Sequence, residues 1–113
     1  MQPRDEDDEV LTLTRSSGNI FADLGLENAD ELLVKADLAH AINTEFESLS
    51  LTQAELGERA GLTQAQVSRI GRMKLEDFSQ ERLQTVLRNL GVDVEIKLHT
   101  RDDGGIGTLK VYA

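Results

Sequence analysis

The spacing of apolar residues divides the chain into three parts. From residue 28 to residue 90 they recur every three or four positions, which is the period of an amphipathic α-helix. In "VDVEIKLH" (92–99) they occupy every second position, which is the period of a β-strand. Residues 5–9, "DEDDE", have no apolar residue to bury, and their like charges repel. We therefore expect a flexible acidic segment at 1–19, a helical domain at 20–91 and a C-terminal β-strand or hairpin at 92–113.

Residues that commonly cap helices mark where four helices should begin. Asn28 precedes the long apolar pattern "ADELLVKADLAHAINTEFES", and Ser79 precedes a helix that Gly91 would end. Thr52 and Thr63 stand in two copies of the tripeptide Leu-Thr-Gln, so each of two short helices begins with the same signal. The expected helices are 28–48, about 53–60, about 64–72 and about 80–90.

Two of these helices carry a clear apolar stripe for a common core. The long helix has one stripe and the fourth helix another, both at helical spacing. The predicted buried residues are Leu32, Leu33, Ala36, Ala39, Ile42 and Phe46 on the former, and Leu83, Val86, Leu87 and Leu90 on the latter.

The two short helices meet the requirements of a helix-turn-helix. Crossed helices need a small residue where they approach closely, and Gly57 stands there. The turn between them favours a residue that tolerates positive φ, and Gly61 stands there. A plain helical hairpin would supply apolar contacts, but not so readily both glycines. The apolar residues expected at the crossing are Leu56, Ala60, Leu62, Val67 and Ile70.

"LTQAELGERAGLTQAQVSRI", followed by a capped helix ending in "LRNLG", resembles the lambda-repressor-like, or XRE, helix-turn-helix family. The resemblance implies a mainly α-helical bundle of four to five helices whose second short helix enters the DNA major groove. The sequence departs from the family at "GRMK" (71–74), where members more often carry a charged residue and then a glycine. Gly71 should weaken the recognition helix near its end.

Helical geometry assigns DNA-binding roles on the second short helix. If Val67 and Ile70 face the core, the opposite side is free for DNA. Gln suits adenine, Arg suits guanine and an alanine methyl can touch a thymine methyl. Thr63 and the other polar residues near helix ends suit phosphates. The predicted base-reading residues are Gln64, Ala65, Ser68 and Arg69, and the predicted phosphate-binding residues are Gln53, Thr63, Arg72 and Lys74.

Each assignment has a simpler alternative. A solvated surface residue or a plain helix cap would account for most of these positions, and capping is the main role expected of Thr63. For Arg69 the groove is favoured, because no acid flanks it in the sequence to serve as a partner. A single such module buries little DNA, so a homodimer on a palindromic operator is expected.

A longer stretch, "SSGNIFADLGLENADELLVKADLAHAI" followed by the helix-turn-helix, resembles the HigA-like XRE antitoxins of toxin–antitoxin pairs. The resemblance implies two activities: neutralising a basic RelE/HigB-like (Gp49-like) ribonuclease toxin, and repressing the shared operon. Candidate toxin contacts are Ile20, Phe21 and Leu24, although for Phe21 packing in the chain's own core is the favoured interpretation. The C-terminal hairpin is the next candidate, and a stand-alone repressor without a toxin is the alternative function.

Composition narrows the remaining possibilities. The 113-residue chain has a net charge of −9, yet three cations and no acid lie between residues 62 and 75. It has no cysteine, and His40 and His99 each stand without the neighbours a metal site needs, so no enzyme, metal or cofactor is expected. "GGIG" (104–107) fits a hairpin turn better than a phosphate loop. No apolar run is long enough to span a membrane, so a cytoplasmic location is expected.

Overall fold

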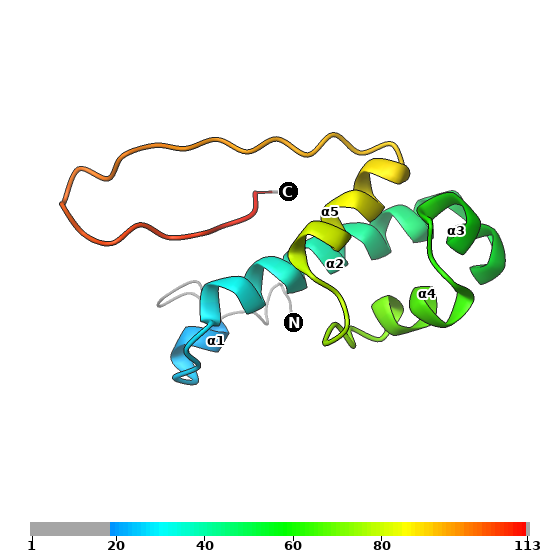
Figure 1. Cartoon of the computed structure of the whole chain (residues 1–113), viewed down its shortest axis with the longest axis horizontal. Coiled ribbons are helices and arrows are strands. Elements are labelled where there is room, and N and C mark those ends of the chain that lie inside the picture. Colours follow the sequence, from blue (N-terminus) through cyan, green and yellow to red (C-terminus); the bar gives the residue numbers. More distant parts are fainter. Residues whose placement is uncertain (1–18, 113) are drawn as a thin grey trace, which may run out of the picture. The chain divides into compact units, whose positions relative to one another are not determined.

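The computed structural model describes residues 19–112, which contain five α-helices (Figure 1). The expected acidic segment at 1–19 therefore lies outside the described residues, apart from Asn19. The helix boundaries lie within about two residues of those predicted, since caps and apolar period act locally. The helices are α1 (Ile20–Asp23), α2 (Ala29–Leu49), α3 (Gln53–Ala60), α4 (Gln64–Gly71) and α5 (Gln80–Asn89).

The chain divides into two compact units, and the boundary lies between residues 33 and 34. The described part of the first unit contains α1, a one-turn helix that was not among the predicted helices. The buried side chain of Asn19 caps it by accepting hydrogen bonds from the amides of Phe21 (2.9 Å) and Ala22 (3.1 Å). The Asn19 amide also donates to Asp30 Oδ1 at 3.1 Å. A buried polar side chain thus satisfies the otherwise unpaired amides of this helix start.

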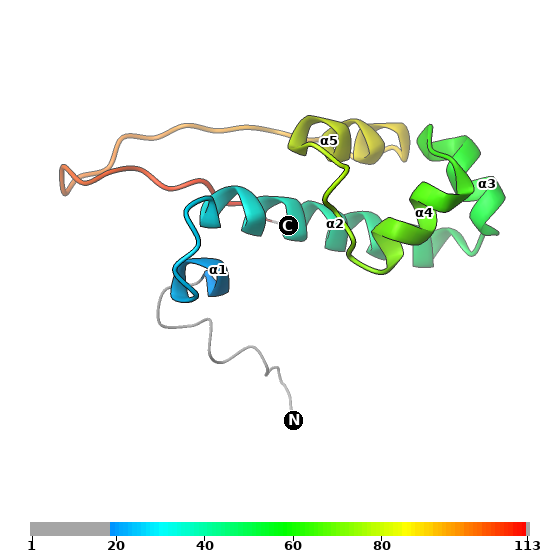
Figure 2. The same ribbon diagram turned by 60° about the horizontal axis from the view of Figure 1, so that its bottom comes forward.

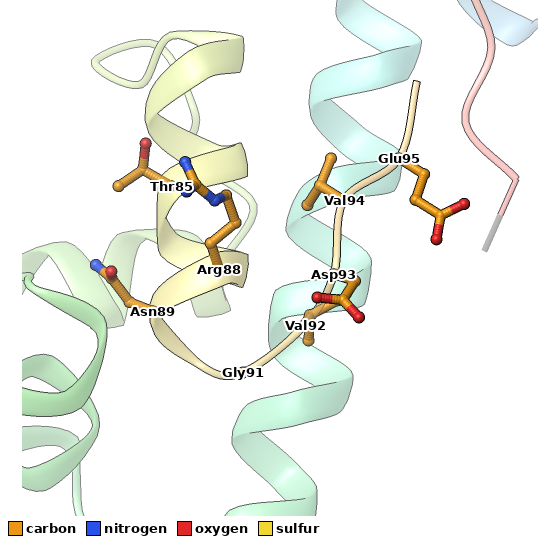
Figure 3. Close-up of a pocket in the computed structure, with 8 residues that line it drawn as sticks. All are labelled: Thr85, Arg88, Asn89, Gly91, Val92, Asp93, Val94 and Glu95. Atoms are coloured by element: carbon orange, nitrogen blue, oxygen red, sulfur yellow. The ribbon is translucent and has the colours of Figure 1, made fainter. Parts of the chain in front are cut away.

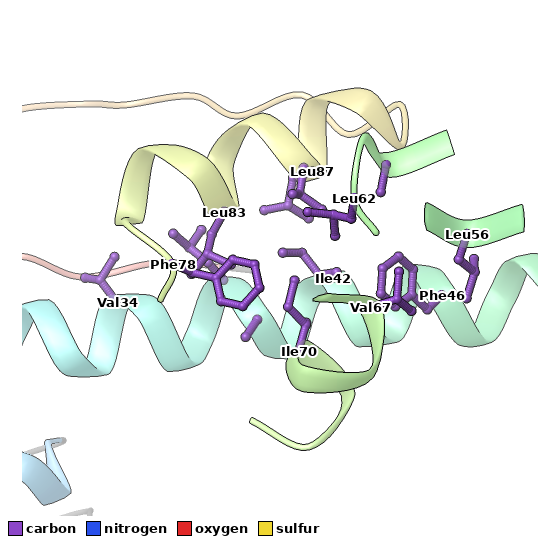
Figure 4. Close-up of a cluster of buried hydrophobic side chains, with 14 residues drawn as sticks. Val34, Ile42, Phe46, Leu56, Leu62, Val67, Ile70, Phe78, Leu83 and Leu87 are labelled. Atoms are coloured by element: carbon purple, nitrogen blue, oxygen red, sulfur yellow. The ribbon is translucent and has the colours of Figure 1, made fainter. Parts of the chain in front are cut away.

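The second unit contains one hydrophobic core, which α2 crosses and α3, α4 and α5 enclose (Figure 4). The five apolar residues predicted at the helix crossing are all buried there. Phe78, in the connector between α4 and α5, is only 2% exposed and was not predicted as a core residue. The core consists of Val34, Leu38, Ala39, Ile42, Phe46, Leu56, Ala60, Leu62, Val67, Ile70, Phe78, Leu83, Val86 and Leu87.

The predicted buried stripe of α2 was partly wrong. Its C-terminal half is buried as expected, at Ala39, Ile42 and Phe46. Further toward the N-terminus, however, Val34 and Leu38 are buried, whereas the predicted Leu32, Leu33 and Ala36 are only half-buried. "LLVKADLA" offers two overlapping apolar stripes, and the elements that pack on the helix choose between them.

The predicted C-terminal strand or hairpin is not present in the single chain. Residues 92–112 form no β-ladder among the described residues, although the chain reverses direction near residues 101–105 (Figures 1 and 2). The Asp103 carboxylate stabilises this turn by accepting hydrogen bonds from Arg101 Nε and the Gly105 amide, both at 2.9 Å. An isolated two-stranded hairpin is marginal in water, so a turn alone does not impose pairing.

Candidate nucleic-acid interface

Thr52 and Thr63 cap α3 and α4, as predicted, and each does so within a full capping box, which was not predicted. The Thr52 hydroxyl accepts from the Glu55 amide at 3.2 Å, and the Glu55 carboxylate accepts from the Thr52 amide at 2.9 Å. Thr63 and Gln66 repeat the arrangement at 3.1 and 2.9 Å. The hydrogen bonds from the Thr52 backbone and hydroxyl hold the pKa of Glu55 below its usual value. Both helices therefore begin at fixed positions, with their N-terminal backbone groups at the surface.

The two glycines of the helix-turn-helix occupy the positions predicted for them. A Cβ added to Gly57 would lie 2.6 Å from the Leu62 carbonyl oxygen, so only glycine allows this approach. Gly61 ends α3 with φ of 75°, and its amide donates to the Gly57 carbonyl. The close crossing of α3 and α4 thus depends on both residues.

Three polar side chains from α2 and α5 hold the helix-turn-helix by its backbone carbonyls. Asn89 Nδ2 donates to the Ala60 carbonyl at 2.9 Å, and Arg82 Nη2 donates to the adjacent Gly61 carbonyl at 2.8 Å. At the other end, Asn43 Nδ2 donates to the Ile70 carbonyl at 3.0 Å. The bonds to Ala60 and Gly61 supply donors to carbonyls at the end of α3, and the Ile70 carbonyl accepts the Asn43 bond in addition to one from the Met73 amide. The sequence gives no signal for them, because the partners lie 21 to 29 residues apart.

The structure places the predicted base-reading residues on the side of α4 away from the core. Gln64 and Ala65 are exposed, and Ser68 and Arg69 are half-buried, whereas Val67 and Ile70 are buried. The predicted phosphate-binding residues are all exposed. Gln53 and Thr63 stand at the starts of α3 and α4, and Arg72 and Lys74 lie just after the end of α4.

Arg69 has an intrachain partner, contrary to the argument from the flanking sequence. Its Nη1 atom lies 3.6 Å from Asp77 Oδ2, in the connector after α4. The two side chains are 42% and 74% exposed, and exposed pairs of this kind contribute at most about 1 kcal/mol. The ion pair therefore holds the Arg69 guanidinium beside the end of α4, but it is weak enough for Arg69 to leave Asp77 when DNA binds.

The chain leaves α4 in the region where "GRMK" departs from the family pattern. Met73 adopts φ of 59°, the left-handed conformation that glycine adopts most easily. Its amide donates to the Ile70 carbonyl at 3.0 Å, and the Lys74 amide donates to the Arg69 carbonyl at 2.9 Å. The helix therefore ends in a left-handed turn without a glycine at that position, and Arg72 and Lys74 follow directly from α4.

Other kinds of site receive little support from the described residues. No three histidine or acidic side chains between residues 19 and 112 are grouped so that they could hold a metal ion. None of the helices in this range has the length and apolarity that a membrane crossing requires. The exposed side of α4 and the starts of α3 and α4 remain the surface with the most specific chemistry.

Comparisons with known proteins agree with this geometry. Residues 20–99 match a family described as a helix-turn-helix domain. A solved structure described as a "Putative XRE Family Transcriptional Regulator" is similar to the chain, with 35% sequence identity and a TM-score of 0.70. The similarity covers 76% of this chain and 97% of that chain. No curated protein matches the sequence.

Proposed function

The chain belongs to the helix-turn-helix family of XRE-type DNA-binding transcriptional regulators, and on this premise we propose that it is a repressor whose α4 enters the major groove of its operator. The observation that carries the proposal is the exposed outer side of α4. A capping box fixes the start of α4, and Asn43 on α2 donates to the Ile70 carbonyl near its end. A second capping box and Asn89 on α5 hold the preceding α3. A protein that recognises a DNA base sequence needs a rigid helix presented to the major groove in this way.

The first turn of α4 approaches the base edges in this arrangement. Gln64 and Ala65 project there, and Ser68 and Arg69 follow one turn later on the same side. The N-terminal amides of α3 and α4 attract phosphate oxygens beside Gln53 and Thr63. Arg72 and Lys74 add positive charge where the chain leaves α4. The base contacts supply specificity, and the phosphate contacts supply register and much of the affinity.

Replacing Arg69 tests the groove assignment. Arg69→Ala should weaken operator binding by roughly 1–3 kcal/mol, because a guanidinium-to-guanine contact is lost. Asp77→Ala is the matched control, since it breaks the same ion pair but leaves the guanidinium available for DNA. Fluorescence anisotropy with operator and scrambled duplexes measures both variants. If Arg69→Ala and Asp77→Ala bind the operator equally well, Arg69 does not read bases.

We further propose that the regulator is the antitoxin of a RelE/HigB-like ribonuclease toxin, and that it represses their shared operon as a homodimer on a palindromic operator. The resemblance of residues 16–42 to HigA-like antitoxins supports this role. The net charge of −9 also suits a basic RNA-binding partner, because complementary charge speeds association. Of the three candidate toxin contacts, Leu24 is 69% exposed, whereas Ile20 and Phe21 are half-buried.

Co-expression with the adjacent reading frame separates an antitoxin from a stand-alone repressor. An antitoxin restores growth and co-purifies with that product, whereas a stand-alone repressor does neither. Leu24→Asp should weaken toxin binding and leave operator binding unchanged, since Leu24 lies outside the helix-turn-helix. If this variant still neutralised the toxin fully, Leu24 would not be a toxin contact, and the C-terminal segment would be the remaining candidate.

A further inference from the structure

The first part of the C-terminal segment exposes apolar side chains, and its backbone belongs to no β-ladder within residues 19–112. Val92 and Val94 are half-buried against the core, but the same alternation continues outward to Ile96 and Leu98, which are 73% and 92% exposed. No β-ladder satisfies the backbone of residues 93–100 within the described chain. An extended edge with an apolar side is a ready template for another strand.

In residues 92–99 the acidic residues come first and the basic residues follow. The polar positions between the apolar ones are Asp93 and Glu95 in the first half, and Lys97 and His99 in the second. When such a segment pairs with an identical one in the antiparallel direction, the acidic half of each copy lies opposite the basic half of the other. A parallel arrangement would instead place like charges side by side, which destabilises a sheet.

We propose that residues 92–100 form an antiparallel strand pair with the same residues of a second copy, with the two-fold axis at Ile96. In this register Ile96 faces Ile96 of the second copy, and Val94 faces Leu98. On the opposite side Glu95 faces Lys97, and Asp93 faces His99. The cross-strand pairs from 93 to 99 are therefore apolar (Ile96 with Ile96, Val94 with Leu98), oppositely charged (Glu95 with Lys97), or an acid opposite an imidazole that can donate a hydrogen bond to it (Asp93 with His99).

Neighbouring registers lack this complementarity. An axis at residue 95 would place Glu95 against Glu95, and an axis at residue 97 would place Lys97 against Lys97. An axis between two residues would place apolar side chains opposite charged ones, because the side-chain period is two. The sequence of the segment thus selects one self-pairing register.

The structure leaves room for the second strand beside residues 92–95. An open pocket of about 610 Å³ lies between α5 and the start of the segment (Figure 3). Thr85, Arg88 and Asn89 line its α5 side, and Asp93 and Glu95 are among the residues on the other side. In the Ile96-centred register, residues 97–100 of the second copy run along 92–95, so Lys97 and His99 meet this acidic edge. The inference rests on the homodimer proposed above and assigns it a dimerisation element.

Cross-linking tests the position of the axis. The chain has no cysteine, so Ile96→Cys introduces a single thiol that can only link two copies. Residues directly opposite in an antiparallel pair have Cα atoms about 4.5–5.5 Å apart, which suits a disulfide. Mild oxidation of the full-length chain should give a covalent dimer at least tenfold faster for Ile96→Cys than for Ile106→Cys, which is also exposed. Equal rates would overturn the register.

Charge reversal tests the complementarity by sedimentation equilibrium. Glu95→Lys places like charges opposite each other twice per dimer and should raise the dimer Kd by roughly tenfold. Glu95→Lys combined with Lys97→Glu should restore the wild-type Kd. Glu47→Lys on α2, which changes the net charge equally, should leave it unchanged. A monomeric wild-type chain, or failure of the double variant to restore the Kd, would overturn the inference.

These outcomes separate the dimerisation element from DNA recognition. A chain that is monomeric in solution yet shifts operator DNA, with a loss on Arg69→Ala, would contradict the strand pairing and leave the α4 proposal standing. If residues 92–100 became protected from amide exchange only on toxin binding, the second copy would not be their partner.

Discussion

At the scale of single residues, two glycines of the helix-turn-helix show how surroundings decide a role. Gly57 and Gly71 are both helical. A Cβ at Gly57 would lie 2.6 Å from a backbone oxygen, whereas a Cβ at Gly71 meets nothing within 4 Å. Glycine is therefore required at the first position, and at the second it only weakens the helix.

Alanine at these two positions should have opposite effects on stability. Gly57→Ala should lower the free energy of unfolding by more than about 2 kcal/mol, because the clash is with backbone that cannot move aside cheaply. Gly71→Ala should raise it by roughly 0.5–1 kcal/mol through helix propensity. Urea denaturation followed by circular dichroism measures both. If Gly71→Ala lowered the free energy of unfolding, a Cβ at this position would not fit as freely as the structure indicates.

Asp37 on α2 gives a pH dependence of stability. Burial raises the pKa of its carboxyl above 3.8, and the nearby His40 partly opposes this. A carboxyl whose folded pKa is raised contributes stability below its unfolded pKa and loses it as the pH rises through the folded pKa. Asp37→Asn should therefore raise the urea midpoint at pH 7 and change it less at pH 3. An unchanged midpoint at pH 7 would show that the buried charge costs nothing.

At the scale of elements, the position of α3 and α4 depends on side chains from other helices. Asn89 and Arg82 on α5 bind the last carbonyls of α3 and its turn, and Asn43 on α2 binds a carbonyl near the end of α4. Short helices such as these are not stable in isolation. Their orientation is therefore a property of the bundle, and DNA recognition depends on residues that do not touch DNA.

Removing one of these bonds should affect both stability and recognition. Asn89→Ala leaves the Ala60 carbonyl without its donor and should cost about 1–3 kcal/mol of folding free energy. Operator affinity should also fall in conditions where the variant is fully folded, because α3 is held less firmly against α5. The neighbouring exposed Arg88→Ala is a stability control. If Asn89→Ala and Arg88→Ala unfold at the same urea concentration, the hydrogen bond is not important.

At the scale of the whole molecule, charge is distributed unevenly. The net charge is −9, yet residues 62–75 contain Arg69, Arg72 and Lys74 and no acid. An acidic protein with such a segment is repelled by DNA in most orientations and attracted in one. The uneven charge thus favours the orientation in which α4 faces the duplex.

The salt dependence of operator binding measures this attraction. Lys74→Gln should reduce the slope of log K against log salt concentration by about one for each protomer bound, because one phosphate contact and its counterion release are lost. Lys110→Gln, an exposed lysine on the C-terminal segment, is the matched control and should leave the slope unchanged. Equal slopes for both variants would show that Lys74 does not contact phosphate.

Most of the features that could be predicted from the sequence depend on interactions between residues only a few positions apart. A threonine three residues before a glutamate or glutamine sets a helix start, and a glycine tolerates positive φ wherever the chain requires it. The starts of α3 and α4, the turn at Gly61 and the residues buried at the crossing therefore followed from the sequence. The exposure of Gln64 and Ala65 followed from the same helical period.

The sequence by itself determined where the helices of the DNA-binding unit begin and end, because caps and turns act locally. Only the tertiary structure decided which stripe of α2 is buried, that Phe78 joins the core, and that Arg69 meets Asp77. It also decided that Asn43, Arg82 and Asn89 hold the helix-turn-helix, and that "VDVEIKLH" forms no strand in one chain. These outcomes depend on which distant segments pack together, and a β pattern forms a strand only when another edge pairs with it.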